Sequence, residues 1–96
     1  MKSLQKIKST LIENKNYLFS VYPIKSIAIF GSYARKQQSD KSDLDLLVEF
    51  DGKIGIRFID LADEIERLVG FKVDLVSRNG IKDKYYKSIS SDLIYV

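Results

Sequence analysis

Two acidic residues spaced two apart are the first feature of this sequence that could carry chemistry. Asp43 and Asp45 stand at the start of the segment DLDLLVEF, which spans residues 43–50. If that segment is a strand, both carboxylates lie on one face of it, because side chains alternate along a strand. Neighbouring carboxylates repel each other, and Mg²⁺ held by carboxylates and substrate phosphates would relieve that repulsion. The alternative is that Asp43 caps a turn and Asp45 faces solvent, since aspartate is common at strand ends.

A third acid, Asp74, interrupts the apolar segment Val73–Val76. A charge inside a buried strand is costly unless it is paired or bound to a metal ion. If this strand neighbours the first, Asp74 joins the other two carboxylates. Three carboxylates around divalent ions would suit phosphoryl-type transfer. The alternative is an edge position in which Asp74 pairs with Lys72 or Arg78.

Gly31 and Ser32 follow the β-branched, apolar segment Ser26–Phe30 and precede a short predicted helix. Glycine lets the backbone approach a phosphate closely, and free amides and the serine hydroxyl can donate to its oxygens. The P-loop pattern is not met, because no Gly-Lys-Ser/Thr follows, and a purely structural turn is the alternative. Arg35 could hold a triphosphate or brace one of the aspartates, although a structural salt bridge explains an arginine equally well.

The elements that must position these residues alternate between helix and strand. Pro23 ends the first predicted helix, and Gly70 is a natural stop for the third. The apolar spacing predicts helices over residues 2–21, 32–38, 58–69 and 81–89, and strands over residues 26–30, 43–50, 72–77 and 93–96. This order predicts an α/β (α+β) sandwich in which helices pack on a small mixed sheet.

The amino-acid composition excludes several kinds of site. The 96 residues are 45% hydrophobic and 30% charged, which predicts one globular domain over residues 1–96. Cysteine and histidine are both absent, so disulfides, thiolate metal sites and histidine acid–base catalysis are excluded. No segment has the length of a membrane span or the apolar run of a signal peptide, so we expect a cytoplasmic protein.

The pattern formed by these residues resembles the DNA polymerase beta-like nucleotidyltransferase superfamily, and within it the minimal nucleotidyltransferases (MNT proteins). The hallmark of that family is Gly-Ser, ten residues, and then Asp-x-Asp. Here Gly31-Ser32 is followed by residues 33–42 and then by Asp43-Leu44-Asp45. The family usually has glycine after the arginine, whereas this chain has Lys36. Three further segments are similar to the family: Ser42–Val48, Val73–Val76 and Ile94–Val96.

The resemblance implies a single minimal nucleotidyltransferase domain with ATP as substrate and Mg²⁺ as cofactor. It implies that Gly31 and Ser32 hold the triphosphate, and we add Arg35 as a nucleotide-binding candidate. Asp74 would act either as a metal ligand or as the base that takes the proton from an attacking hydroxyl. The acids with an implied catalytic and metal-binding role are Asp43, Asp45 and Asp74.

MNT proteins resemble the antitoxin half of two-gene modules whose toxin is a HEPN-type ribonuclease, silenced by transfer of AMP from ATP to one of its tyrosines. We therefore expect a HEPN-type toxin as partner, homo- or hetero-oligomers, no membrane association and no direct nucleic-acid binding. The alternative is a non-catalytic antitoxin that masks the toxin, with Tyr85 and Tyr86 as an aromatic anchor, although core packing is the preferred expectation for both. Transfer to a small molecule or an RNA end ranks last, because no acceptor pocket is evident.

Overall fold

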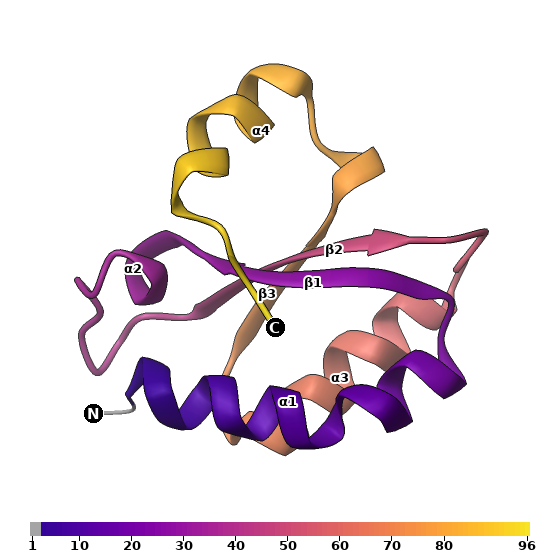
Figure 1. The fold of residues 1–96 in the computed structure, drawn as a ribbon, viewed down its shortest axis with the longest axis horizontal. Helices are drawn as coiled ribbons and strands as arrows, with labels where there is room; N and C mark the ends of the chain where they lie inside the picture. Colours follow the sequence, from indigo (N-terminus) through magenta and orange to yellow (C-terminus); the bar gives the residue numbers. More distant parts are fainter. Residues whose placement is uncertain (1–2) are drawn as a thin grey trace.

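A four-stranded sheet forms the middle layer of the computed structural model, which describes residues 3–96. Helices α1 (Leu4–Val21) and α3 (Arg57–Val69) cover one face, and α4 (Asp83–Ile89) lies on the other face (Figure 1). The strands are β1 (Ile24–Phe30), β2 (Leu44–Phe50), β3 (Val73–Ser77) and β4 (Ile94–Tyr95). Three short pieces complete the chain: α2 (Gly31–Ala34) and the 3₁₀ turns η1 (Arg78–Gly80) and η2 (Ser90–Asp92).

The sheet is mixed, as the sequence predicts. Its strand order is β3-β2-β1-β4. Strand β1 pairs antiparallel with both β2 and β4, whereas β2 and β3 are parallel and are joined through α3. Strands β3 and β4 are therefore the two edges, and β2 lies between the strand that leads into α2 and the strand that carries Asp74.

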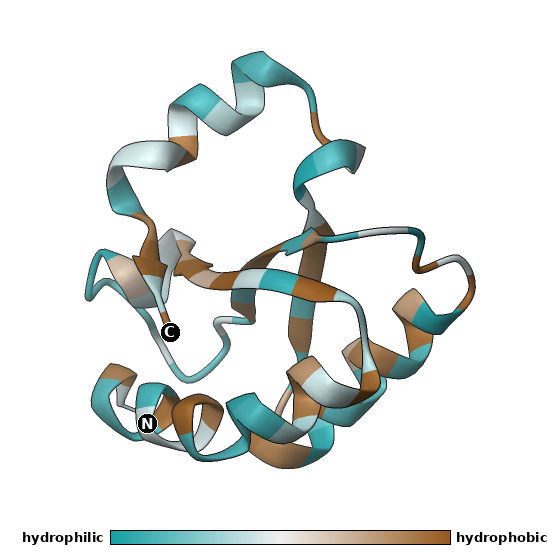
Figure 2. Ribbon diagram, turned by 45° about the vertical axis from the view of Figure 1, so that its right-hand side comes forward, coloured by the Kyte–Doolittle hydropathy of each residue, from teal (hydrophilic) through white to brown (hydrophobic). Residues whose placement is uncertain are grey.

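The main core lies between the sheet and the helices α1 and α3. Along β2, Leu44, Leu46 and Val48 are buried and point into this core, as the predicted alternation requires. Figure 2 shows apolar residues, in brown, along the strands and mixed brown and teal residues along the helices α1 and α3. The helices contribute fully buried side chains to this core: Leu11, Leu18, Leu61 and Ile65.

Helix boundaries follow local sequence signals. Helix α1 begins after Ser3, whose hydroxyl accepts a hydrogen bond from the Lys6 amide at 3.1 Å, and the predicted start at residue 2 lies outside the described residues. Helix α3 ends at Gly70, which has a left-handed φ of 86°. The predicted helix over 32–38 is wrong in extent, since α2 ends at Ala34 and Lys36 adopts a φ of 58°. Within residues 3–96, no helix combines the length and apolarity needed to cross a membrane.

Candidate active site

Strand register brings Asp45 and Asp74 side by side. The two residues are direct partners on the parallel strands β2 and β3, and Phe30 is the partner of Asp45 on the other side. Partnered residues point to the same face of a sheet. That face is the one toward α4, because Phe30 packs with Leu47 and Ile89 in a second, smaller apolar cluster. The candidate site therefore lies at one end of the sheet, on the face that α4 covers only in part.

Gly31 is in direct contact with the Asp45 carboxylate. It follows Phe30 at the end of β1 and adopts a φ of 74°. A Cβ built on Gly31 would lie 2.1 Å from Oδ2 of Asp45, so a side chain at this position would force the carboxylate to move. Ser32 follows, half-buried, and its carbonyl accepts a hydrogen bond from the Gln37 amide at 2.8 Å. The sequence therefore forms a tight turn whose backbone lies against a carboxylate.

The surroundings of Asp45 disfavour its charged form. Burial raises its pKa from 3.8 to about 6, and the negative charges of Asp74 and Asp43 add to the increase. Arg35 opposes this effect by lowering the pKa, while a hydrogen bond with Asp74 raises it further. Two carboxylates held this closely bind a proton or a cation more readily than either would alone.

The other two acids lie in more exposed positions than the sequence suggests. Asp43 precedes the first residue of β2 and is exposed, so the strand-face argument does not apply to it. It still lies near enough for its charge to raise the pKa of Asp45 and of Tyr33. Asp74 is exposed on the edge strand β3, as the alternative of an edge position predicts, while Val73 and Leu75 on either side of it are buried. Its proposed partner Arg78 instead pairs with Asp83 at 3.2 Å.

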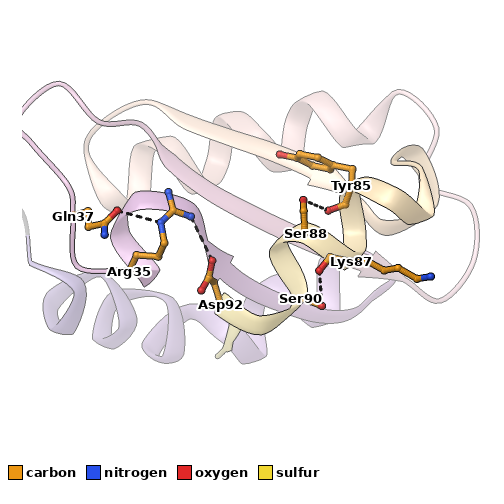
Figure 3. A network of polar contacts seen from close by, with 7 residues as sticks. All are labelled: Arg35, Gln37, Tyr85, Lys87, Ser88, Ser90 and Asp92. Carbon is orange, nitrogen blue, oxygen red and sulfur yellow. Dashed lines mark hydrogen bonds and ion pairs between the residues drawn. The ribbon is translucent and has the colours of Figure 1, made fainter.

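Arg35 links the turn after Gly31 to the end of the chain. Its guanidinium lies 3.4 Å from the carboxylate of Asp92 in η2, and its Nε donates to Oε1 of Gln37 at 3.3 Å (Figure 3). The side chain is exposed, and its charge acts on Asp45. A salt bridge was one of the alternatives that the sequence allowed for Arg35. Its partner Asp92 could not be identified, because no local signal connects two residues so far apart in the sequence.

The donor set fits an open site for a hard cation. Asp45 and Asp74, which are cross-strand partners, would offer a cation oxygen ligands only, which is the preference of Mg²⁺. Within residues 3–96, however, no group of three or more histidine, cysteine, aspartate or glutamate side chains is arranged to hold a metal ion. The predicted three-carboxylate cage is therefore not preformed. Mg²⁺ is commonly held by one or two carboxylates together with substrate phosphates, and this pair satisfies that requirement.

Two aromatic residues border the site without having been predicted to do so. Phe30 is buried beside Asp45, and the ring of Tyr85 lies 6.5 Å from the Phe30 ring at an interplanar angle of 83°. Tyr85 is 45% exposed, so the expectation that it packs in the core is wrong. Tyr86 is partly buried, with the Arg78 guanidinium 3.9 Å from its ring centroid. The spacing of apolar residues could not tell which of the two tyrosines would face outward.

Comparisons of the sequence with known proteins agree with this geometry. A family model described as polymerase beta, nucleotidyltransferase matches residues 5–95. A provisionally named protein adenylyltransferase of Methanocaldococcus jannaschii is 50% identical over 98 aligned residues, which cover 100% of both chains. The protein adenylyltransferase MntA of Thermococcus cleftensis is 34% identical over 97 residues, covering 100% of this chain and 98% of that one.

Comparisons of the fold also find nucleotidyltransferases. A solved structure provisionally described as a minimal nucleotidyltransferase matches with a TM-score of 0.76 at 29% identity, covering 97% of this chain and 95% of that one. A chain of a complex of the tri-AMPylated Shewanella oneidensis HEPN toxin with its MNT antitoxin gives a TM-score of 0.69 at 19% identity, with coverage of 96% and 70%. A toxin–antitoxin structure with AMP-PNP gives 0.70 at 23%, with coverage of 98% and 72%. The last two likenesses show the fold alone, and the predicted nucleotidyltransferase fold is confirmed by the first.

Proposed function

Because this chain belongs to the polymerase beta nucleotidyltransferase family, we propose that it transfers AMP from ATP to a tyrosine of a HEPN-type toxin and so acts as an antitoxin. The nucleotidyltransferase activity is that of the family. The proposal adds four points to this activity: the nucleotide is ATP, transfer requires Mg²⁺, the protein acts in the cytoplasm, and the acceptor is a tyrosine. We also propose that residues 1–96 form one catalytic domain.

The acceptor class is supported by relatives of nearly the same length. Two of them, from Methanocaldococcus jannaschii and Thermococcus cleftensis, carry the name protein adenylyltransferase, and this chain spans 98% or more of each. A similar fold occurs in a complex of a tri-AMPylated HEPN toxin with an MNT antitoxin. Together they favour a protein acceptor over a small molecule or an RNA end.

The observation that carries the proposal is the contact between the Gly31 backbone and the Asp45 carboxylate, with Asp74 as the next residue across the sheet. A structural turn would need glycine for its φ alone. Here the missing side chain also leaves the Asp45 carboxylate in contact with the backbone that precedes Ser32. Phosphate oxygens that accept hydrogen bonds from this turn would therefore meet a carboxylate-bound cation at the same point.

Each residue then has a defined part in the transfer. We assign the Ser32 hydroxyl and the backbone amides of its turn to the triphosphate, and the Asp45 carboxylate to the cation. Mg²⁺, when bound, would neutralise phosphate charge during transfer. The acceptor hydroxyl oxygen forms a bond to the α-phosphorus as the bond to the bridging oxygen breaks and pyrophosphate leaves. The hydroxyl proton passes to water or to Asp74, whose exposed carboxylate lies beside Asp45.

The direct test is transfer of label from α-labelled ATP to the product of a neighbouring HEPN-type gene. We expect label on the toxin with wild-type protein and Mg²⁺, and none with Asp45→Asn, which keeps the shape of the side chain but not its charge. Asp63→Asn is the matched control, because Asp63 is an exposed acid on α3, across the sheet from the site. Label that persists in Asp45→Asn, or that is lost equally in the control, would contradict the proposed site.

A masking antitoxin without catalysis is the second candidate, and one observation favours it. Ile56 and Ile59 at the start of α3 are 87% and 64% exposed, and exposed aliphatic side chains of this size are suited to burial against another protein. The same experiment separates the two functions. Tight binding of the toxin with no transferred label would support masking, while label on the toxin would support catalysis.

A further inference from the structure

A hollow along α4 has no role in the function proposed above. It has a volume of about 420 Å³ and is open to solvent. Its lining consists of Ile81, Lys82, Lys84, Tyr85 and Ser88. The Ser88 hydroxyl donates to the Tyr85 carbonyl at 2.7 Å (Figure 3), so it is engaged with the helix backbone. What remains for a ligand is an aromatic ring, an aliphatic side chain and the stems of two lysines.

One residue, Tyr85, connects the hollow with the candidate active site, because it lines the hollow and its ring also lies near the Phe30 ring. The centroid of the Tyr85 ring, which is carried by α4, lies 6.5 Å from the centroid of the Phe30 ring. Phe30 is the cross-strand partner of Asp45 and the residue before Gly31. A molecule that contacts both the turn at Gly31 and the Asp45 carboxylate therefore reaches Tyr85 by extending along the same face of the sheet.

We propose that this hollow receives the purine base of the nucleotide, with the Tyr85 ring as its stacking platform. The inference rests on the proposed nucleotidyltransferase site, which fixes where the phosphates lie. Aromatic rings stack on nucleobases, and an open apolar hollow of this volume lies within the size range of small-molecule sites. Lys82 and Lys84 line the hollow with their stems, and both carry positive charge, which favours a polyanionic ligand. Tyr85 is thus a binding residue for the base and takes no part in the chemical step.

The exposure of Tyr85 supports this assignment. Its neighbours Phe30 and Ile89 are buried, at 3% and 8% exposure, whereas Tyr85 retains 45% on the same side of the sheet. An aromatic ring left half open beside Phe30, the cross-strand partner of Asp45, gains little from core packing alone. A stacked base would cover it and complete the apolar cluster under α4.

The test compares two triphosphate ligands, one that carries adenosine and one that does not. Equilibrium binding of ATP and of inorganic tripolyphosphate is measured in Mg²⁺ for wild type, Tyr85→Ala and Tyr85→Phe. Stacking is worth enough that Tyr85→Ala should weaken ATP binding between about five-fold and about a hundred-fold. Tripolyphosphate binding should not change, and Tyr85→Phe should bind ATP as wild type does. In the transfer assay, Tyr85→Ala should raise the KM for ATP and leave kcat nearly unchanged.

Controls separate this inference from the function on which it rests. Tyr17→Ala removes a tyrosine of similar exposure, 53%, from α1 on the opposite side of the sheet, and it should bind both ligands as wild type does. Wild-type protein that binds ATP in an Asp45-dependent way, combined with unchanged ATP binding by Tyr85→Ala, would overturn the base site alone. Equal weakening of ATP and tripolyphosphate by Tyr85→Ala would also overturn it. Failure of wild type to bind ATP would overturn the proposed function as well.

Discussion

Replacing Gly31 by alanine tests the contact at the centre of the site. Two costs follow from the structure. A φ of 74° is left-handed, which costs an L-residue about 1–2 kcal/mol, offset by about 0.4–1 kcal/mol from the less flexible unfolded chain. The new Cβ would lie 2.1 Å from Oδ2 of Asp45, and forcing a side chain into filled space costs a further ~1–3 kcal/mol. We expect Gly31→Ala to lower the free energy of unfolding by about 2–4 kcal/mol and to displace the carboxylate.

Gly70 provides the matched control for this substitution. It also has a left-handed φ, 86°, but a Cβ built there meets no atom within 4 Å. Gly70→Ala should therefore cost only the backbone term, about 0.5–1.5 kcal/mol. Urea unfolding of both variants, with m unchanged, gives the difference directly. The excess cost at Gly31 is the energy of the contact with Asp45.

A double-mutant cycle identifies that contact as the cause. Asp45→Ala removes Oδ2 and Cγ, the two atoms nearest the added Cβ, and leaves only Cβ at 3.2 Å. In that background Gly31→Ala should cost little more than Gly70→Ala does, so the two substitutions should be coupled by about 1–3 kcal/mol. Equal destabilisation at the two glycines, or independence from Asp45, would refute the reasoning and would leave Gly31 a simple turn residue.

Three further predictions concern charge and backbone strain around the site. The pKa of Asp45 is raised from 3.8 to about 6, so its protonated form stabilises the fold below about pH 4, and this stabilisation is lost as pH rises through 6. The free energy of unfolding of Asp45→Asn, measured in urea, should therefore equal that of wild type at pH 4 and exceed it at pH 8. Lys36→Gly should stabilise the protein by up to about 1 kcal/mol in urea unfolding, because it removes a left-handed lysine with a φ of 58°, and a lower midpoint would contradict this. Arg35→Gln should raise the pKa of Asp45, followed by carbon NMR of its carboxyl group, because the charge of Arg35 now lowers it.

The elements and their faces were predictable because they depend on local pattern. Leu44, Leu46 and Val48 alternate with Asp45 and Leu47, and the structure buries the first set under α1 and α3. Helix α3 likewise ends at its glycine, as the sequence indicates. In each case, the side chains that decide the outcome lie within one turn or one strand of one another.

The features that could not be predicted depend on distances across the fold. The sequence predicts that Asp74 joins Asp45 only if their strands are neighbours, and the structure pairs the two residues directly. That condition could not be settled in advance, because the register between two strands joined through α3 is not encoded by either strand alone. The bond from Arg35 to Asp92 joins residues 57 positions apart. Tyr85 and Tyr86 are neighbours on the seven-residue helix α4, and the way this helix packs on the sheet decides which of the two tyrosines is exposed.

Because β3 is an edge strand, Asp74 also affects the solubility of the protein. Within residues 3–96 no strand pairs with the outer side of β3, so a row of backbone donors and acceptors there could pair with another copy of the chain. A charged side chain on such a strand discourages that pairing, and Asp74 is the charged residue in the middle of this short apolar strand. Substituting Asp74 by alanine should therefore increase aggregation, measured by light scattering, whereas the same change at Asp45 on the inner strand should not. One carboxylate would then serve the site and keep neighbouring molecules apart.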